Sequence, residues 1–320
     1  MDIPRCPIHH PLVNEVASAL KSSLRTSGLA PYADGPHRGV VRYVQAVVER
    51  SSRTVQVVVV LNQEVSNLPA SSGASGGAEL AEPVSRERLG AFADILRDCL
   101  GARLHSLWWN GNPARTNSIM GPTWERVSGP EVVHEQIGGA DVFFPPGAFG
   151  QSNLDVADAV VDYVATSIPV SARVAEFYAG VGVMGLGLAK RGNVVRINEI
   201  SPASLEGLRL GVDSLEPDER SRVSLFEGSA GDVVHMADGV DVVLVDPPRK
   251  GLAQELLARL VEVPPPSLVY VSCSLASFER DSSILLQDGK FKLTRLAAAD
   301  FFPYTDHVET VAVFEHVRGG

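Results

Sequence analysis

The chain has 320 residues, 45% hydrophobic and 21% charged, a composition that excludes a wholly disordered or fibrous protein. The length suits two domains of about 150 residues each. No apolar run reaches the roughly 18 residues that a membrane span needs, and the first residues lack the apolar segment of a secretory signal. We therefore expect an intracellular protein, cytoplasmic or organellar, with a plastid or mitochondrion included.

Charge is spread unevenly along the chain. The formal net charge is −10, and residues 1–150 carry 13 basic and 14 acidic side chains, against 15 and 24 in residues 151–320. A strongly acidic half argues against a nonspecific polyanion binder, although it is compatible with a small basic groove. The three cysteines, Cys6, Cys99 and Cys273, cannot form a disulfide framework, so a reactive thiol among them is worth seeking.

Residues 1–145 are expected to form a smaller α+β domain. Apolar residues at helical spacing predict helices over 10–24 and 86–100, the second with Cys99 on its apolar face as a structural thiol. Runs over 39–48 and 54–61 predict a hairpin, and 104–109 predicts a further strand. The Ser/Gly/Ala-rich stretch 69–81 indicates a flexible loop.

Residues 146–320 alternate between short strands and helices, which predicts an α/β domain with a parallel, doubly wound sheet. We expect strands over 173–177, 194–197, 223–226, 240–245 and 268–271, with helices over 184–191, 201–215, 252–261 and 278–286. Residues 290–297 and 310–314 are expected to form an antiparallel hairpin at the edge. Because ligands bind at the carboxyl ends of such strands, the residues after each strand are the functional candidates.

The first two strand ends favour a nucleoside-containing cofactor. Gly180, Gly182 and Gly185 follow the first strand where a helix begins, so the backbone can approach a ligand closely. Glu199 follows the second strand, about 20 residues on, where a carboxylate suits ribose hydroxyls. The alternative for Glu199 is a solvated helix-cap carboxylate.

Asp246 ends the fourth strand, and the two prolines after it stiffen the backbone and remove two donors. An Asp held in this way can accept hydrogen bonds from a ligand amine or a nucleobase. A buried strand that ends in Asp-Pro-Pro resembles methyltransferases acting on nucleic-acid bases. The alternative is a tight turn that only ends a buried strand.

Cys273 follows the fifth strand in the same crevice, where it is placed to act as a nucleophile, although most free cysteines are structural. His307 and Glu309 lead the last strand. Because positions i and i+2 share a face, both side chains are expected to point toward the crevice. Next to Cys273, Glu309 becomes a candidate base.

Together these motifs resemble the RNA uridine-C5 methyltransferases, enzymes that make 5-methyluridine in transfer or ribosomal RNA from S-adenosylmethionine. The matching stretches, in chain order, are 149–153, 178–182, 246–251, 271–273 with 280–281, and 307–309. The resemblance covers roughly 140–316, and more loosely the front half at Trp108–Asn110 and Gly121. It implies a Rossmann-like catalytic domain over 146–320, preceded by an RNA-facing α+β domain over 1–145.

Carried over by position, the resemblance implies a set of site residues. Cys273 is the implied nucleophile and Glu309 the implied base. The implied ligands of S-adenosyl-L-methionine are Gln151, Tyr178, Glu199 and Asp246. Phe149 is a stacking platform for the target base, and Arg249 and Arg280 could contact phosphate or a developing enolate. RNA is the implied partner, and no membrane is involved.

The sequence departs from the family pattern at several points. Ser274 and Leu275 replace the usual Asn-Pro after the nucleophile, and Ala179 stands where a cysteine is frequent. The family's N-terminal β-barrel has no counterpart. Of its four-cysteine iron–sulfur site only Cys6, before a proline, has one, so we expect no metal site and no cluster in this chain. These departures suggest a truncated member or a fragment.

Two other functions stay open. One is an RNA base methyltransferase that uses only the Asp246 corner, without covalent catalysis. The other is a catalytically silent RNA-binding relative. A dehydrogenase fits less well, because the glycine spacing is not the dinucleotide fingerprint.

Overall fold

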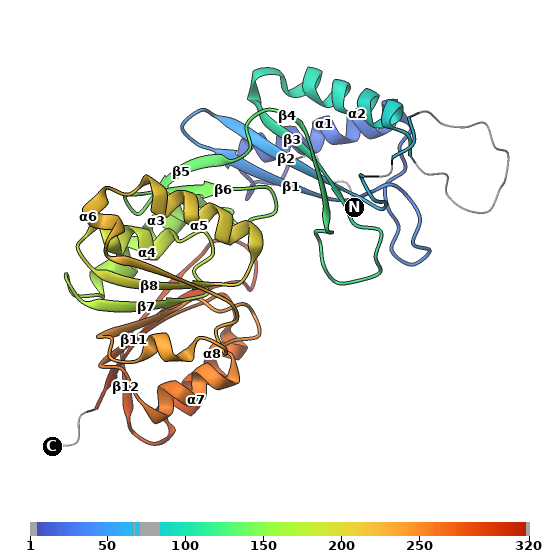
Figure 1. The fold of residues 1–320 in the computed structure, drawn as a ribbon. Helices are drawn as coiled ribbons and strands as arrows, with labels where there is room; N and C mark the ends of the chain where they lie inside the picture. The colour runs from blue at the N-terminus through green and yellow to red at the C-terminus, as the bar shows by residue number, and fades with distance from the viewer. Residues whose placement is uncertain (1–4, 67, 71–83, 318–320) are drawn as a thin grey trace. The chain divides into compact units, whose positions relative to one another are not determined.

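The structure is a computed structural model that describes residues 5–66, 68–70 and 84–317. The chain divides into two compact units (Figure 1): residues 1–133 with 145–147, and residues 134–144 with 148–320. Residues 134–144, placed by sequence in the first domain, therefore group with the second unit. Within the described ranges no helix is long and apolar enough to cross a membrane. Most of the expected loop over 69–81 lies outside the described residues.

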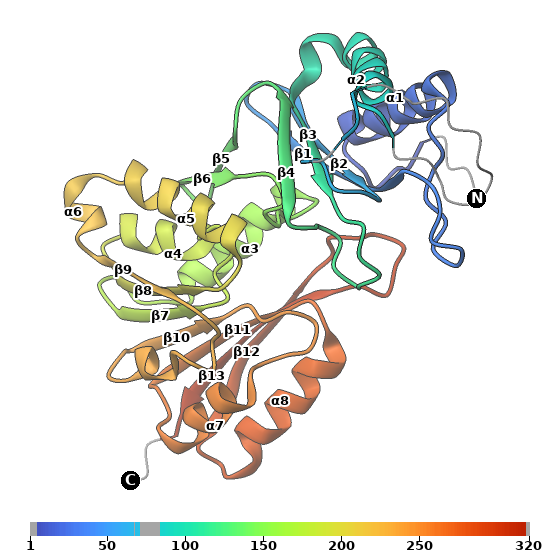
Figure 2. The ribbon, with the colours of Figure 1, turned by 45° about the vertical axis from the view of Figure 1, so that its right-hand side comes forward.

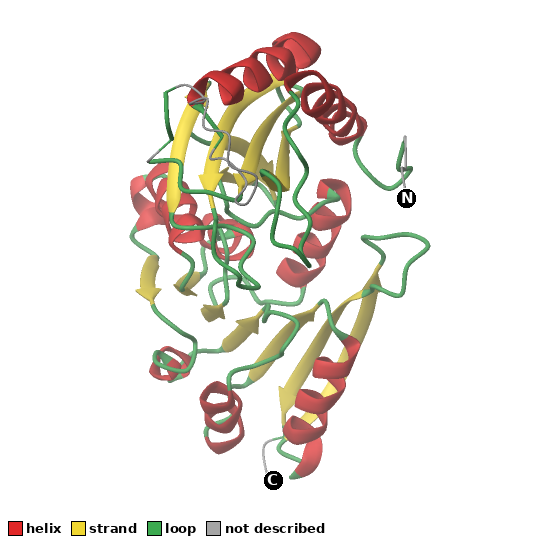
Figure 3. Ribbon diagram, turned by 90° about the vertical axis from the view of Figure 1, so that its right-hand side faces the viewer, coloured by secondary structure: helices red, strands yellow, loops and turns green. Residues whose placement is uncertain are grey.

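The first unit is a four-stranded sheet in the order β1–β2–β3–β4, with two helices on one face (Figure 3). Strand β2 pairs antiparallel with β1 and parallel with β3. Most residues of β2 are β-branched, and all of those after Thr54 are buried. The elements are α1 (Pro11–Ser27), β1 (Val41–Glu49), β2 (Thr54–Leu61), α2 (Arg86–Leu100), β3 (Leu104–Gly111) and β4 (Thr123–Ser128). The predicted helices, hairpin and third strand are confirmed.

Cys99 is a correction to the sequence analysis. Helix α2 begins after Ser85, whose hydroxyl accepts the N–H of Arg88 at 3.4 Å, and it buries Leu89, Phe92 and Leu96 against the sheet. Cys99 comes three residues after Leu96, yet its side chain is exposed. The buried stripe continues through Leu100 instead, so Cys99 is a surface thiol.

The second unit has a seven-stranded sheet in the order β12–β13–β11–β10–β7–β8–β9. The pairs from β11 to β9 are parallel, and β13 joins β11 and β12 antiparallel. The strands are β7 (Arg173–Phe177), β8 (Val194–Glu199), β9 (Val223–Glu227), β10 (Val242–Val245), β11 (Ser267–Ser272), β12 (Phe291–Ala299) and β13 (Glu309–His316). The doubly wound parallel sheet is confirmed. In the terminal hairpin, β12 is the edge strand of the sheet, and β13 lies between β12 and β11.

Helices cover both faces of this sheet (Figure 1). On one face lie α3 (Leu154–Thr166), α4 (Val183–Lys190) and α5 (Pro202–Ser214); on the other lie α7 (Gln254–Glu262) and α8 (Leu275–Gln287). The hairpin β5 (Val133–Ile137) and β6 (Ala140–Phe144) packs on α4 and α5, and the short α6 (Pro217–Arg220) precedes β9. Val243, Leu244 and Val245 of β10 are fully buried, which is why this strand is a continuous apolar run.

Candidate active site

The candidate site lies at the carboxyl ends of the parallel strands. The strand order reverses between β7 and β10: the chain runs outward through β8 and β9 on one side and through β11 on the other (Figure 2). In a sheet of this topology the crevice at the reversal is where ligands bind. The residues that follow β7, β8, β10 and β11 meet there.

Glu199, at the end of β8, anchors the glycine-rich turn after β7. Its Oε2 accepts the N–H of Gly180 at 2.7 Å, and its Oε1 accepts those of Ile200 and Ser201 at 2.8 and 2.6 Å. The carboxylate is buried and fixed in position. Three backbone N–H groups thus fix the carboxyl group beside the turn, and its oxygens keep lone pairs that could accept a ligand hydroxyl.

A second carboxyl lies beneath the same turn. Glu176, in β7, is 1% exposed, and among the described residues neither of its carboxyl oxygens has a well-formed hydrogen bond. A Cβ on Gly185 would lie 2.1 Å from Glu176 Oε2, so only glycine fits where α4 crosses this carboxyl. Burial, together with the charges of Asp246 and Glu199, raises the pKa of Glu176 to about 8, although the Gly185 amide offsets part of the shift.

Cys273 and Glu309 meet across the pairing of β11 with β13. Ser272 pairs with Thr310, so the residue after Ser272 and the residue before Thr310 lie at the same end of the two strands. Burial raises the pKa of Glu309 to about 7. Burial first, and then the neighbouring charges of Glu309 and Asp246, raise the pKa of the half-buried Cys273 thiol.

Asp246 completes this cluster of acidic groups. Burial of its carboxyl, with the charge of Glu309, raises its pKa to about 8. The residue as a whole keeps some surface exposure, as expected of a group at the floor of an open crevice. Arg249, three residues on, is exposed and is the cation that lowers the pKa of Cys273.

The turn that holds Cys273 is bracketed by two serines. The Oγ of Ser272 accepts the N–H of Ser274 at 3.2 Å and donates to its carbonyl at 3.1 Å. Ser274 caps α8, because its hydroxyl accepts the N–H of Ser277 at 3.4 Å. Serine and asparagine are both good N-cap residues, so Ser274 can start the helix where the family uses Asn.

His307 is a second correction. Strand β13 begins at Glu309, so the alternation of a strand does not extend back to His307. The His307 side chain is exposed and lies edge-on to Phe302, with ring centroids 6.2 Å apart. It therefore does not share the buried position of Glu309.

Three of the other predicted residues lie in the second unit, and one lies in the first. Phe149 is 70% exposed, and Gln151 is half-buried. The hydroxyl of Tyr178 accepts the N–H of Ala253 at 2.9 Å, and Tyr178 adopts a left-handed backbone with φ of 63°. Cys6, in the first unit, is a half-buried free thiol whose backbone bonds to Asn14. The roles of these residues stay predictions.

Arg280 is exposed, but its guanidinium is committed to hydrogen bonds within the protein. Its Nε and Nη2 donate to Asp281 Oδ1 at 2.9 and 2.7 Å, and Nη2 also donates to the carbonyl of Lys250 at 2.8 Å. The sequence analysis assigned no role to Glu176, although an acidic residue inside an apolar strand is a signal. It placed Asp281 in a matching stretch but gave it no role, and only the contacts reveal what it bonds to.

The site fits a cationic, nucleoside-containing cofactor. The carboxyl groups of Glu176, Asp246 and Glu309 have raised pKa values, and a positive charge placed among them would favour their ionised forms. A Rossmann-like sheet that brings an acidic crevice, a glycine-rich turn and a cysteine to one edge defines an S-adenosylmethionine-dependent methyltransferase class of fold.

Comparison with known proteins identifies the family. Residues 229–317 match the family model described as tRNA (uracil-5-)-methyltransferase. The chain is 32% identical over 98% of its length to an uncharacterized RNA methyltransferase of Protochlamydia amoebophila, of which it covers 78%. It is 28% identical to the tRNA (uracil(54)-C(5))-methyltransferase of Pyrococcus abyssi, covering 98% of this chain and 67% of that protein. The chain belongs to the RNA methyltransferase family represented by the Protochlamydia amoebophila protein.

A solved structure of a similar protein supports this assignment. The crystal structure of the Pyrococcus abyssi tRNA (uracil-54, C5)-methyltransferase in complex with S-adenosyl-L-homocysteine superimposes with a TM-score of 0.73 and 26% identity, over 98% of this chain and 70% of that one. Against several other curated RNA methyltransferases the chain spans only 63 to 65% of their length.

Proposed function

We propose that this protein transfers a methyl group from S-adenosylmethionine to C5 of a uridine in RNA, through a covalent bond between Cys273 and C6 of the base. The observation that carries the proposal is the meeting of Cys273 with Glu309 at one end of β11 and β13, beside Asp246. Transfer RNA is the favoured substrate, because the Pyrococcus abyssi relative is named for uracil 54 of tRNA.

In the proposed reaction, Cys273 acts as the nucleophile and Glu309 as the base. C5 of a resting uracil is a poor nucleophile. Addition of the Cys273 thiolate to C6 forms a C–S bond and converts the C5–C6 double bond into an enolate, which makes C5 reactive. The bound cofactor supplies the electrophilic methyl group. Glu309 then removes the proton from C5, and that electron pair restores the double bond and expels the thiolate.

The charges around the two groups suit these tasks. A base with a pKa near 7 can accept a proton and release it again at neutral pH. The Cys273 thiol is neutral in the resting site, because burial and the carboxylates raise its pKa. A positive charge among those carboxylates lowers that pKa, so an occupied cofactor site favours the thiolate.

The remaining residues are proposed to bind cofactor and RNA. Glu199 would accept hydrogen bonds from ribose hydroxyls, and Asp246, Gln151 and Tyr178 would contact the rest of the cofactor. Phe149, with its ring largely in solvent, would stack on a base that has left its own stack. Arg249 would contact phosphate or the enolate oxygen.

The test uses RNA that contains 5-fluorouridine. Fluorine at C5 leaves Glu309 no proton to remove, so the covalent protein–RNA adduct accumulates. We expect an adduct on Cys273, located by peptide mapping, with a tRNA transcript and only when S-adenosylmethionine is present. Cys273→Ala should abolish it. Cys99→Ala, which removes an exposed thiol of the first unit, should not.

Other outcomes favour the other functions. Methylation of ordinary RNA that survives Cys273→Ala would establish a base methyltransferase without covalent catalysis. Cofactor binding with neither adduct nor methylation, on tRNA or on ribosomal RNA, would favour a catalytically silent relative.

A further inference from the structure

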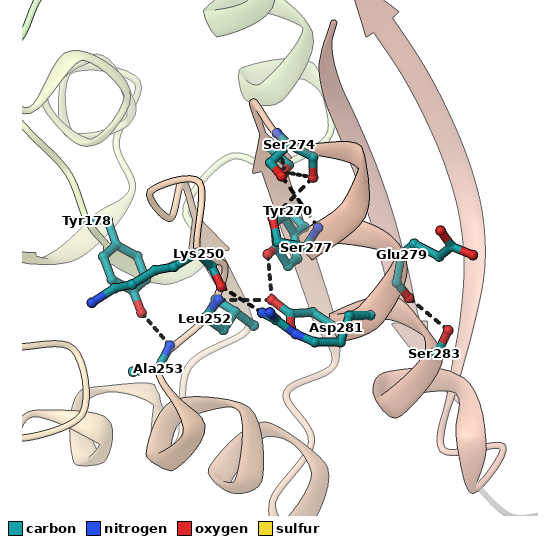
Figure 4. Close-up of polar contacts among 12 residues, drawn as sticks. Tyr178, Lys250, Leu252, Ala253, Tyr270, Ser274, Ser277, Glu279, Asp281 and Ser283 are labelled. Carbon is teal, nitrogen blue, oxygen red and sulfur yellow. Dashed lines mark hydrogen bonds and ion pairs between the residues drawn. The ribbon is translucent and has the colours of Figure 1, made fainter. Parts of the chain in front are cut away.

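Asp281, in α8, is the most densely bonded buried charge near the site (Figure 4). It is 0% exposed. Its Oδ2 accepts the hydroxyl of Tyr270 at 2.8 Å and the N–H of Leu252 at 2.9 Å. Its Oδ1 accepts two guanidinium N–H groups of Arg280 at 2.9 and 2.7 Å. Four donors thus converge on one carboxyl group, two on each oxygen.

These four bonds join three segments that carry the proposed site. Leu252 directly follows the loop 246–251, which begins with Asp246 and contains Arg249. Arg280 bonds to the same loop a second time, through the carbonyl of Lys250. Tyr270 lies in β11, three residues before Cys273. We call Tyr270, Lys250–Leu252, Arg280 and Asp281 the Asp281 clamp.

The arrangement leaves no room for a side chain at Gly251. Gly251 has a φ of 83°, and a Cβ there would lie 2.3 Å from Arg280 Nη2 and 2.5 Å from Asp281 Oδ2. The next residue but one, Ala253, donates its N–H to the hydroxyl of Tyr178, which belongs to the glycine-rich turn. The loop is therefore tied to the nucleophile's strand on one side and to the cofactor turn on the other.

We propose that Asp281 is a positioning residue for methyl transfer. By holding the loop 246–251 and strand β11 in one register, it aligns the cofactor contact at Asp246 with the nucleophile Cys273. Arg280 acts through Asp281 and the Lys250 carbonyl, a task distinct from contacting RNA. The inference rests on the proposed function for the roles of Asp246 and Cys273, but the clamp itself can be tested without catalysis.

The experiment compares Asp281→Asn, Arg280→Lys and the matched control Ser283→Ala in the full chain. In Asp281→Asn, an amide NH2 group replaces a carboxyl oxygen that accepts two hydrogen bonds, so donors would face donors. In Arg280→Lys, an ammonium group replaces the planar guanidinium and its forked pair of donors. Ser283 lies on the same helix, is exposed, and donates its hydroxyl to the carbonyl of Glu279 within α8 (Figure 4). Tyr270→Phe removes one of the four bonds and serves if Asp281→Asn does not fold.

Three measurements separate positioning from plain stability. We expect Asp281→Asn and Arg280→Lys to weaken S-adenosylhomocysteine binding at least about tenfold, since small displacements of site groups cost that much or more. Peptides over 246–253 should exchange amide hydrogens faster, while those over β7 and β8 stay as in the wild type. Adduct formation with 5-fluorouridine RNA should be slower even at saturating cofactor. Tyr270→Phe should show smaller shifts in the same direction, and Ser283→Ala none.

The opposite pattern would overturn the proposal. If the folded variants exchange hydrogens at the wild-type rate over 246–253 and bind S-adenosylhomocysteine as tightly, Asp281 positions nothing. If exchange rises equally everywhere and adduct formation at saturating cofactor is unchanged, Asp281 serves stability alone. A wild-type protein that forms no adduct would count against the proposed function, while hydrogen exchange and cofactor binding would still decide on the clamp.

Discussion

At the scale of single residues, the buried carboxyl of Glu176 makes stability depend on pH. Its pKa is raised to about 8 in the folded chain, mainly by burial, from the 4.5 of an ordinary Glu. The folded state therefore binds more protons than the unfolded state between these values. This contribution is complete below about pH 4.5 and is lost as the pH rises through about 8.

Glu176→Gln should remove that dependence, because Gln resembles the protonated acid at every pH. We expect the variant to gain on the wild type as the pH rises from 5 to 8.5, by at least about 1.4 kcal/mol, the equivalent of a single pKa unit. Urea unfolding at the two pH values measures the difference. Glu279→Gln, which removes an exposed carboxyl of α8, is the control. An equal gain in both variants would show that Glu176 is not the titrating group.

At the scale of elements, the turn at Gly251 offers a matched pair of substitutions. Gly251 and Gly289 both have left-handed backbones, with φ of 83° and 64°, so alanine at either position costs about 1–2 kcal/mol of strain. Only at Gly251 would the new Cβ strike other groups, since nothing lies within 4 Å of the Cβ position at Gly289.

We expect Gly251→Ala to weaken S-adenosylhomocysteine binding markedly and Gly289→Ala to leave it near the wild-type value, with both proteins folded and Gly251→Ala the more destabilised, because its new Cβ also meets Arg280 and Asp281. Calorimetric titration measures the affinity, and thermal unfolding measures the stability. Equal affinities for the two variants would mean that the loop 246–251 tolerates displacement.

Helices and strands whose apolar residues recur at a regular spacing could be predicted from the sequence. Elements that are defined by their packing partners could not. Strand β7 and helix α2 have the bounds that their apolar patterns indicate. The hairpin β5–β6 was missed, although Gly138 and Gly139 separate two short alternating runs, a usual hairpin signal. Pattern alone also could not assign this hairpin to the second unit, because its contacts with α4 and α5 lie far along the chain.

The same division holds for the site. Cys273, Glu199 and Asp246 could be singled out as candidates because each stands at or just after the end of a strand, and the topology brings the ends of parallel strands together. His307 was misplaced because it precedes β13, which begins at Glu309, so the alternation of a strand does not reach it. Asp281 was not identified as a site residue, since its partners Leu252 and Tyr270 come from other elements and no local spacing encodes that convergence.

At the scale of the whole molecule, charge limits how RNA can be held. Residues 151–320 carry 24 acidic and 15 basic side chains, and residues 1–150 are close to neutral. Each phosphate that a cation neutralises releases counterions, so the slope of log affinity against log salt counts such contacts, at about 0.7 each for single-stranded nucleic acid. A chain of net charge −10 should make few of them. Its RNA recognition should then depend on stacking and on contacts to the base.

We therefore expect tRNA binding, followed by fluorescence anisotropy from 50 to 200 mM salt, to show a slope of magnitude below about 3. Arg249→Gln should reduce that slope by about one contact's share, because Arg249 is the exposed cation at the crevice. Arg209→Gln, which removes a cation already paired with Glu227, should leave it unchanged. A slope as steep as that of proteins making six or more phosphate contacts would instead require a broad basic surface, and recognition would then rest on the backbone of the RNA.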